Sequence, residues 1–302
     1  MTGKPMIKPK TKGAICDFLF VVPALVLLLC FTYYPICKLV DISFTDWNLL
    51  SDEFSYVGFK NWKWLFAGTG AKYLWNSLEV TFLYSLGELA VTIVGGMLFA
   101  LLFNRMSKGF GVMRALVFMP KYVAMSSAAV IFLWLLNTEY GVVNYMFKLI
   151  QLTPVDWLNQ KSTALFSVLM LTGWRVIGYG MMIYLAAMMS ISRDYYEAAS
   201  LDGASPAQQF FRITLPLLSP TTLFLLVTTF LASMKVFQSV DILTEGGPSR
   251  ATEVFVYLIY RYAMVDFRMD RAATAAVMFF VILLVITVAT MKVSNNKITY
   301  DS

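Results

Sequence analysis

Polar side chains interrupt two apolar stretches of this chain at spacings that suit the binding of a polar solute. Thr172, Arg175 and Tyr179 fall at i, i+3 and i+7, which places them on one face of a helix. Thr229 and Ser233, in the next apolar stretch, are four residues apart. Hydroxyl groups and aromatic rings are the groups that bind a sugar, by hydrogen bonding and stacking. The sequence predicts a cavity lined by Thr172, Trp174, Arg175, Tyr179, Thr229 and Ser233.

The arginine in this set needs a partner or water. An arginine at the centre of a bilayer costs roughly 2.5–3.5 kcal/mol on insertion scales, so Arg175 must face protein or a water-filled cavity. Two placements remain open from the sequence. Arg175 either lines the solute cavity or pairs with Glu88, another charged residue inside an apolar stretch, and holds two helices together.

The elements that position these side chains are apolar helices. The 302 residues are 59% hydrophobic and only 14% charged, whereas soluble domains are about one-quarter charged. A helix needs roughly 20 apolar residues to cross a bilayer. We therefore predict an all-α membrane protein with six spans, at residues 16–40, 73–103, 115–137, 163–190, 218–242 and 271–292.

The topology is predicted from the first tail. Residues 1–15 carry four lysines and no acid, which favours a cytoplasmic N-terminus. An even number of spans then places the C-terminal tail, residues 293–302, on the same side. Lysines and arginines in the remaining loops are distributed on both sides of the membrane and add little to the prediction of topology. We find no internal repeat and no separable soluble domain, so residues 16–292 are expected to form one transmembrane domain.

The loop at residues 191–217 is the most polar insert between two spans. Ser192 is a suitable N-cap for a first short helix, and Gly203 provides the conformational freedom that ends it. Ser205, Pro206 and Gln208 form a capping box with proline at the first helical position. The sequence thus predicts two short helices joined at a glycine, at the cytoplasmic face.

On the opposite side, two connecting segments have features of their own. Residues 41–72 are rich in Trp and Phe, which is typical of chain at a membrane interface. Residues 244–271 begin with a Gly-Gly-Pro break, and a short amphipathic stretch follows. This pattern predicts a helix that lies along the membrane surface.

Several kinds of chemistry are excluded or disfavoured by composition. The chain contains no histidine, which removes imidazole metal sites and catalysis by a histidine base. No GxxxxGK[ST] loop is present, so the chain lacks the usual phosphate cradle for ATP. No dense basic run with interleaved aromatics points to nucleic acid. We therefore expect a protein that is not an enzyme and has no cofactor or metal.

The loop sequence resembles a known signature. ABC-importer permeases carry EAA, three residues, G, nine residues and I-x-L-P. All seven fixed positions are occupied here, by Glu197, Ala198, Ala199, Gly203, Ile213, Leu215 and Pro216. At background frequencies of roughly one in ten to twenty per position, chance gives such a match on the order of once in 10⁸ windows.

Other segments resemble the carbohydrate branch of that family, the maltose-type permeases. They include "SFTDW", "YVGFKNWKWLF" and "TEGGPSRATEVFVYLIYRYA". The resemblance implies the type I importer permease fold, located in the cell membrane, with a coupling helix between spans four and five. It implies as partners a second permease, two copies of an ATPase and an extracytoplasmic sugar-binding protein. It assigns ATPase coupling to Glu197, Ala198, Ala199, Asp202 and Gly203.

Two alternatives stay open. The solute of an importer of this class need not be a sugar, and Arg175 and Lys235 stand where maltose-type permeases have neutral side chains, so an anionic or unusual oligosaccharide also fits. An ion-coupled secondary transporter is the second alternative. Such transporters usually contain paired internal repeats and broken helices in matching halves, which this sequence does not display.

Overall fold

The computed structural model describes residues 11–51, 53–104 and 108–297 of the chain. Within these ranges the regular structure is helical, and the only β pairing is one isolated bridge between Thr45 and Tyr56. The predicted all-α class is therefore confirmed. The predicted tails at 1–15 and 293–302 lie partly outside the described residues, and the described parts, 11–15 and 293–297, continue the first and last helices.

Four helices are long and apolar enough to cross a membrane without a break. Their spanning parts are Asp17–Ile42, Gly70–Phe103, Lys161–Met189 and Met269–Lys292. Short π-helical turns interrupt the first two of these helices. The first consists of α1 (Thr11–Leu28), η1 (Leu29–Tyr33) and α2 (Tyr34–Ile42). The second consists of α4 (Gly70–Ala90), η2 (Val91–Gly95) and α5 (Gly96–Phe103). The other two are α9 (Lys161–Met189) and α16 (Met269–Lys297).

The third predicted span is not one helix. It consists of α6 (Lys108–Phe118), the 3-10 turn η3 (Met119–Tyr122) and α7 (Met125–Leu135). The two halves meet at an angle of 102°. The prediction of a single span at 115–137 is wrong in this respect. Pro120 lies in the turn and cannot donate a backbone hydrogen bond, and Val123 and Ala124 are extended, so the helical hydrogen bonding stops there.

The fifth predicted span, at 218–242, ends early. The loop before it contains α11 (Pro206–Gln209), η4 (Phe210–Thr214) and α12 (Leu215–Leu217), and after a 59° bend α13 (Ser219–Ser233) begins the span. The chain then turns, and α14 (Gln238–Leu243) is a separate helix, so the predicted continuous span at 218–242 is wrong. Lys235 is exposed in the turn between α13 and α14.

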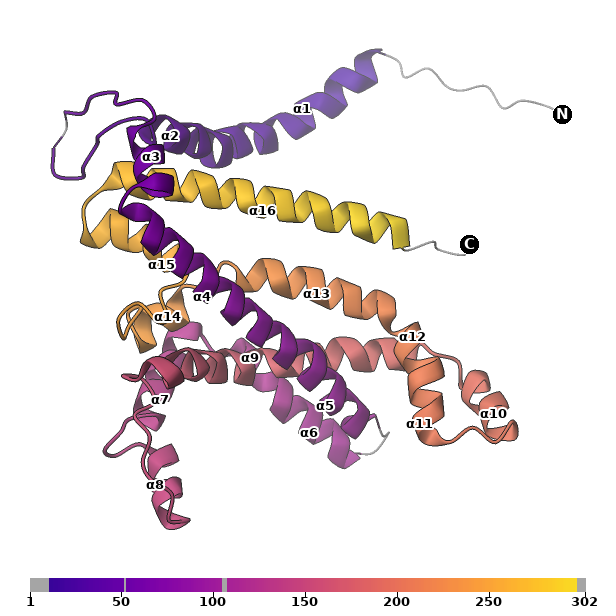
Figure 1. Ribbon diagram of the computed structural model, residues 1–302. Helices are drawn as coiled ribbons and strands as arrows, with labels where there is room; N and C mark the ends of the chain where they lie inside the picture. Colours follow the sequence, from indigo (N-terminus) through magenta and orange to yellow (C-terminus); the bar gives the residue numbers. More distant parts are fainter. Residues whose placement is uncertain (1–10, 52, 105–107, 298–302) are drawn as a thin grey trace.

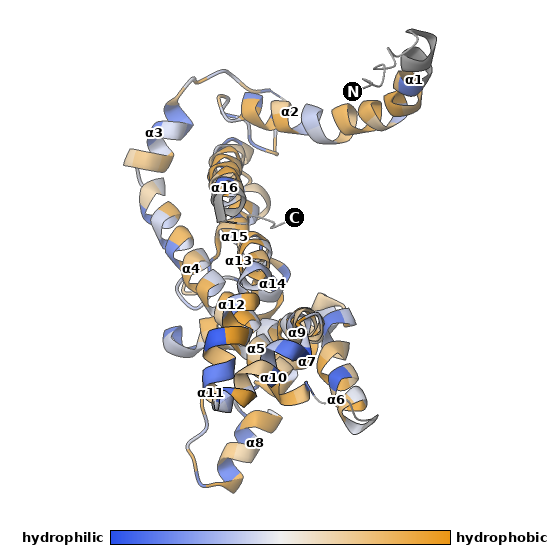
Figure 2. Ribbon diagram, turned by 90° about the vertical axis from the view of Figure 1, so that its right-hand side faces the viewer, coloured by the Kyte–Doolittle hydropathy of each residue, from blue (hydrophilic) through white to orange (hydrophobic). Residues whose placement is uncertain are grey.

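The helices form a bundle with two different ends (Figure 1). The helix α10 (Arg193–Leu201) and α11 lie at one end, to which the free ends of α1 and α16 also point. At the other end lie α3 (Lys60–Ala67), α8 (Val142–Leu149), α14 and α15 (Phe255–Tyr260). Figures 1 and 2 both show α1 projecting away from the bundle while α2 packs against α16, and Figure 2 views the long helices α9, α13 and α16 nearly along their axes.

Close backbone contact between α5 and α9 organises the centre of the bundle. A Cβ added at Gly96 would lie 2.7 Å from the carbonyl carbon of Gly180. Gly87 and Gly95 similarly face Leu169 and Ile177 of α9. The small residues of the second span therefore pack within the chain, and small residues are what allows membrane helices to approach this closely.

The substitution Gly96→Ala is expected to destabilise the chain. The new methyl group would meet backbone atoms of Gly180 and Met181, which cannot move aside as the end of a side chain can. Overpacking of this kind costs about 1–3 kcal/mol. The thermal unfolding temperature in detergent measures the effect. Gly111→Ala in α6 is the matched control, because nothing lies within 4 Å of its added Cβ. Equal unfolding temperatures for both variants would contradict the assignment of close packing.

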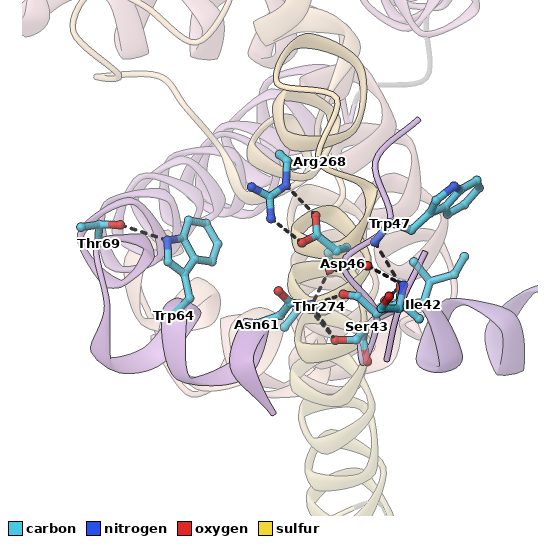
Figure 3. A network of polar contacts seen from close by, with 12 residues as sticks. Ile42, Ser43, Asp46, Trp47, Asn61, Trp64, Thr69, Arg268 and Thr274 are labelled. Carbon is cyan, nitrogen blue, oxygen red and sulfur yellow. Dashed lines mark hydrogen bonds and ion pairs between the residues drawn. The ribbon is translucent and has the colours of Figure 1, made fainter. Parts of the chain in front are cut away.

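A network of polar contacts attaches the end of the first span to the bundle (Figure 3). The buried side chain of Asn61 in α3 donates hydrogen bonds to the carbonyl oxygens of Ser43 and Thr45, at 3.1 and 2.6 Å. Thr274 of α16 donates to the same Ser43 oxygen at 3.3 Å. The backbone N–H of Asp270 donates to the carbonyl of Trp47. The aromatic connection that follows the first span is thus fixed at its base to α3 and α16.

The helix after the Gly-Gly-Pro break is buried. Phe255 and Leu258 of α15 have no exposed surface, and the ring of Phe255 stacks on that of Phe279 in α16 at 4.6 Å. The prediction that this stretch lies along the membrane surface is therefore wrong. Its apolar face covers α4 and α16, because those helices offer more apolar area than the interface does.

Candidate functional site

A polar cavity of about 250 Å³ lies inside the bundle, between the second, third, fourth and fifth spans. Six of its lining residues carry polar side chains, namely Glu88, Thr92, Lys121, Tyr179, Thr228 and Thr229. Val176 and Ala232 complete the lining. Helices distant in sequence therefore place one carboxylate, one ammonium group, three hydroxyl groups and one phenol around the same space.

Two features of the lining bear on what the cavity can bind. The Lys121 ammonium lies 4.9 Å from the centre of the Tyr179 ring, within the range of a cation–π contact. The Thr92 hydroxyl is buried and has no hydrogen-bond partner among the described residues. A buried hydroxyl without a partner costs free energy, so a solute that bonds to it gains affinity. The cavity therefore offers an aromatic face, an available hydroxyl and charges of both signs.

The six residues predicted to line a cavity separate in the structure. Tyr179 and Thr229 line it. Thr172 is buried and accepts a hydrogen bond from the Tyr84 hydroxyl at 2.8 Å, and Ser233 donates to the Phe230 carbonyl within its own helix. Trp174 packs on Phe132 of α7 with ring centres 5.6 Å apart. The lining of this cavity does not include the other four predicted residues, Thr172, Trp174, Arg175 and Ser233.

Arg175 binds the break in the third span. Its guanidinium donates to the carbonyl oxygen of Val123 at 2.9 Å and to that of Lys121 at 3.3 Å. These two carbonyls lie where the helical hydrogen bonding stops between η3 and α7. The ion pairs of the described residues include none between Arg175 and Glu88. Arg175 thus satisfies acceptors that the broken helix exposes in an apolar environment.

Sequence reasoning missed Glu88, Lys121, Thr92 and Thr228 as residues of the cavity. A signal was available for the first two, because ionisable residues inside apolar stretches usually face the interior of a bundle or a water-filled space. No such signal marks Thr92 or Thr228, since hydroxyl residues are common in membrane helices.

The polar loop forms the predicted pair of capped helices. Ser192 Oγ accepts from the backbone N–H of Asp194, and Gly203 has a positive φ of 78° at the end of α10. Both hydrogen bonds of the Ser205–Gln208 capping box are present. Gln209 Nε2 donates to Ser200 Oγ at 2.9 Å, which ties the second helix to the first. The loop is therefore a folded unit.

One face of α10 projects from the end of the bundle. Asp194, Glu197, Ala198 and Leu201 are spaced at i, i+3, i+4 and i+7, and all four are exposed. Leu201 is 90% exposed, which is unusual for a large apolar side chain at a helix end. The ion pairs of the described residues include none with Glu197. An exposed face with a carboxylate, a small residue and an apolar residue is suited to contact with another protein.

At the other end of the bundle, a buried carboxylate organises the Gly-Gly-Pro segment. Glu253 has no exposed side-chain surface and pairs with Arg250 at 3.0 Å and Arg261 at 2.8 Å. The Arg250 guanidinium lies 3.8 Å from the centre of the Tyr73 ring in α4. Burial raises the pKa of the Glu253 carboxyl above its ordinary value, while the two arginines act in the opposite direction. These contacts hold the segment against the N-terminal end of α4, in the second span.

A bundle of apolar helices that surrounds a polar cavity and exposes a capped helix pair at one end defines a membrane transport subunit. Residues 92–299 match the family described as the binding-protein-dependent transport system inner membrane component. The chain belongs to this family.

Similar proteins agree with this assignment. The chain is 33% identical over 285 residues to the probable ABC transporter permease protein YurN of Bacillus subtilis, a match that covers 93% of this chain and 96% of that protein. It is 30% identical to the trehalose/maltose transport system permease protein MalF of Thermococcus litoralis, with 96% and 97% covered.

The fold is also shared with a solved structure. The crystal structure of a bacterial ABC transporter involved in the import of the acidic polysaccharide alginate contains a chain that superposes with a TM-score of 0.81. The two chains are 27% identical, and the match covers 95% of this chain and 97% of the other. The predicted type I ABC importer permease fold is therefore confirmed.

Proposed function

We propose that this chain is a transmembrane subunit of an ABC importer that carries a sugar or oligosaccharide into the cell. The proposal is supported by the family of the chain and by the solutes that several relatives are named for, which include trehalose or maltose and alginate, while others are named for sn-glycerol-3-phosphate. The observation that carries it is the cavity, because a phenol ring and several hydroxyl groups are the groups that recognise a sugar. Within it we assign solute contact to Tyr179 and Thr229, joined by Glu88, Thr92, Lys121 and Thr228.

ATP hydrolysis belongs to a separate subunit in this proposal. The importer contains two copies of an ATPase, one bound to each permease. The exposed face of α10 is the surface through which closure of the ATPase is transmitted to this chain. Glu197, Ala198 and Ala199 lie within this helix, while Asp202 and Gly203 end it. Because Gln209 at the end of α11 donates to Ser200 of α10, and the chain continues from α11 through the 59° bend into α13, displacement of α10 is expected to move a wall of the cavity.

A second permease completes the membrane unit. None of the 18-residue apolar window of the first span is buried, whereas half of the corresponding window of α9 is. The part of the span that projects from the bundle in Figures 1 and 2, α1, leaves its surface for lipid and a neighbouring subunit. An extracytoplasmic sugar-binding protein delivers the solute to the opposite end from α10. The described ends of α1 and α16 point to the side of α10, so both tails are cytoplasmic in this proposal.

We expect the cavity to widen during transport. Its volume of about 250 Å³ lies just below the range of about 300–1,000 Å³ that ligand pockets usually have. In this proposal α13 moves away from α9 and η2, which is the movement that a displaced α10 would drive.

The substitution Tyr179→Ala is expected to reduce sugar uptake strongly while leaving basal ATP hydrolysis and assembly intact. Loss of the ring removes the stacking surface and the cation–π contact with Lys121, at a cost of about 0.5–2 kcal/mol for that contact. Uptake of a panel of radiolabelled neutral and acidic sugars by the importer, reconstituted with its partner subunits, measures the effect.

The control for this experiment is Phe166→Ala, which removes an exposed aromatic ring from the same helix far from the cavity. Tyr179→Phe separates the ring from the hydroxyl group. Uptake that falls equally in the Phe166 variant, or that is unchanged in Tyr179→Ala, would refute the proposed site. Failure of the assembled, ATP-hydrolysing parent importer to take up any sugar of the panel would refute the proposed substrate class.

A further inference from the structure

The short helix α8 exposes a continuous apolar face. Val142, Tyr145, Met146 and Leu149 are spaced at i, i+3, i+4 and i+7, and the last three are each more than 60% exposed. Ile150, directly after the helix, is 66% exposed. Contiguous exposed apolar surface of this kind on a folded helix marks a site of interaction with a partner or a membrane.

The opposite face of α8 is firmly attached to the chain. The side chain of Asn144 is completely buried and donates to the carbonyl oxygens of Thr138 and Val155, at 3.1 and 2.8 Å. Its amide oxygen accepts from the backbone N–H of Val155 and from the Trp157 indole, both at 3.0 Å. The Phe147 ring packs on Trp157. The orientation of the apolar face is therefore fixed by buried contacts.

The position of α8 distinguishes it from the spans. Figure 1 shows α8 beyond α7, at the end of the bundle opposite α10, with its axis across the direction of α9. Figure 2 shows it at the periphery of the bundle. The exposed apolar side chains of α7, including Val130, Ile131 and Trp134, lie on the helix that leads into it. The apolar face of α8 thus extends the surface that the broken span presents to lipid.

We propose that α8 lies in the outer interface of the bilayer, with its apolar face among the lipid acyl chains, and anchors the outer half of the broken third span. Interfacial helices of this type bury their apolar face about 5–10 Å into the boundary between headgroups and chains. Tyr145 has the amphipathic ring that favours this depth. The exposed Lys148, in the last turn, has a side chain long enough to reach lipid phosphates.

Lipid is favoured over a protein partner by continuity and by charge. The helix is joined to surfaces that already face the membrane, whereas a docking site for a soluble protein is ordinarily rimmed by polar groups. Lys148, the charged residue within the helix, is a cation that complements anionic lipid headgroups, while the exposed acid Glu139 lies outside the helix, in the turn before it. An anchored α8 would restrain α7, which begins at the break in the third span. Arg175 binds a carbonyl of this break, and Lys121 beside it lines the cavity, so the anchor would affect the cavity used in transport.

Spin labels test the proposal on the full chain. Met146→Cys and Leu149→Cys are labelled in a background with the three native cysteines replaced by serine. The chain is reconstituted in vesicles of phosphatidylethanolamine and phosphatidylglycerol. Both labels are expected to collide more with oxygen, which concentrates in lipid, than with a water-soluble nickel chelate. Thr153→Cys is the control, because Thr153 is an exposed residue of the loop that covers the opposite face, and its label is expected to give the reverse.

A second variant keeps the test decisive. Tyr145→Asp places a charge on the apolar face and is expected to shift the label at Leu149 from oxygen toward nickel accessibility, whereas Tyr145→Phe leaves it in lipid. Nickel accessibility at Met146 and Leu149 in the parent chain would overturn the proposal. Shielding from both reagents would also overturn it, since that result shows a protein surface covering the helix.

Discussion

Replacement of Glu197 by lysine is expected to abolish sugar-stimulated ATP hydrolysis while the chain stays folded and inserted. Glu197 is exposed on the projecting face of α10, and no ion pair of the described residues involves it, so its loss removes no contact of the chain itself. Exposed substitutions of this kind usually change stability by less than about 0.5 kcal/mol. A reversed charge at a protein interface, by contrast, costs several kcal/mol through repulsion.

The measurement is ATP hydrolysis by the reconstituted importer, with and without sugar-loaded binding protein. Glu139→Lys is the matched control, because it reverses an exposed carboxylate at the opposite end of the bundle. Normal stimulation in the Glu197→Lys importer would show that the carboxylate has no part in coupling. Loss of stimulation in both variants would indicate an effect of net charge rather than of the α10 surface.

The coupling loop was predictable because its structure is determined locally. Ser192, Gly203 and the Ser205–Gln208 pair each act on backbone groups within four residues, so the sequence alone contains both partners of each contact. What the sequence did not indicate is the exposure of Leu201. A leucine at a helix end is ordinarily buried, and only its position at the end of the bundle decides otherwise.

The broken third span was only half predictable. Pro120 is visible in the sequence and marks a place where a helix tends to end. In a membrane, however, a break is tolerated only where other groups satisfy the freed backbone. That group is Arg175, some fifty residues further along the chain. Apolar composition without knowledge of this contact favours one continuous helix.

The residues of the cavity were also only partly predictable from the sequence. Helical spacing placed Thr172, Arg175 and Tyr179 on one face, but each contacts a different neighbour: α4, the break before α7, and the cavity. The residues that complete the lining come from four spans. Periodicity within one helix gives the direction of its side chains and says nothing of which helix lies opposite.

Replacement of Arg175 by alanine is expected to destabilise the whole membrane domain. The change leaves the carbonyl oxygens of Val123 and Lys121 without their donor, in a region where lipid replaces water as the solvent. The contact with the Val123 carbonyl is part-buried and that with the Lys121 carbonyl is exposed, so the loss is expected to come mainly from Val123, at about 1–3 kcal/mol for an unsatisfied buried acceptor. A large fall in the thermal unfolding temperature in detergent, and failure to assemble with the partner subunits, are the expected results.

Arg175→Lys separates the two functions that an arginine has here. An ammonium group preserves the charge, but it lacks the planar fork that reaches both carbonyls at once, so this variant is expected to recover only part of the lost stability. Tyr179→Ala, on the same helix, serves as the comparison, because it is expected to lose uptake and keep its unfolding temperature. If Arg175→Ala instead unfolds at the parent temperature and loses only uptake, the guanidinium acts on the solute, and the break between η3 and α7 must be held by other contacts.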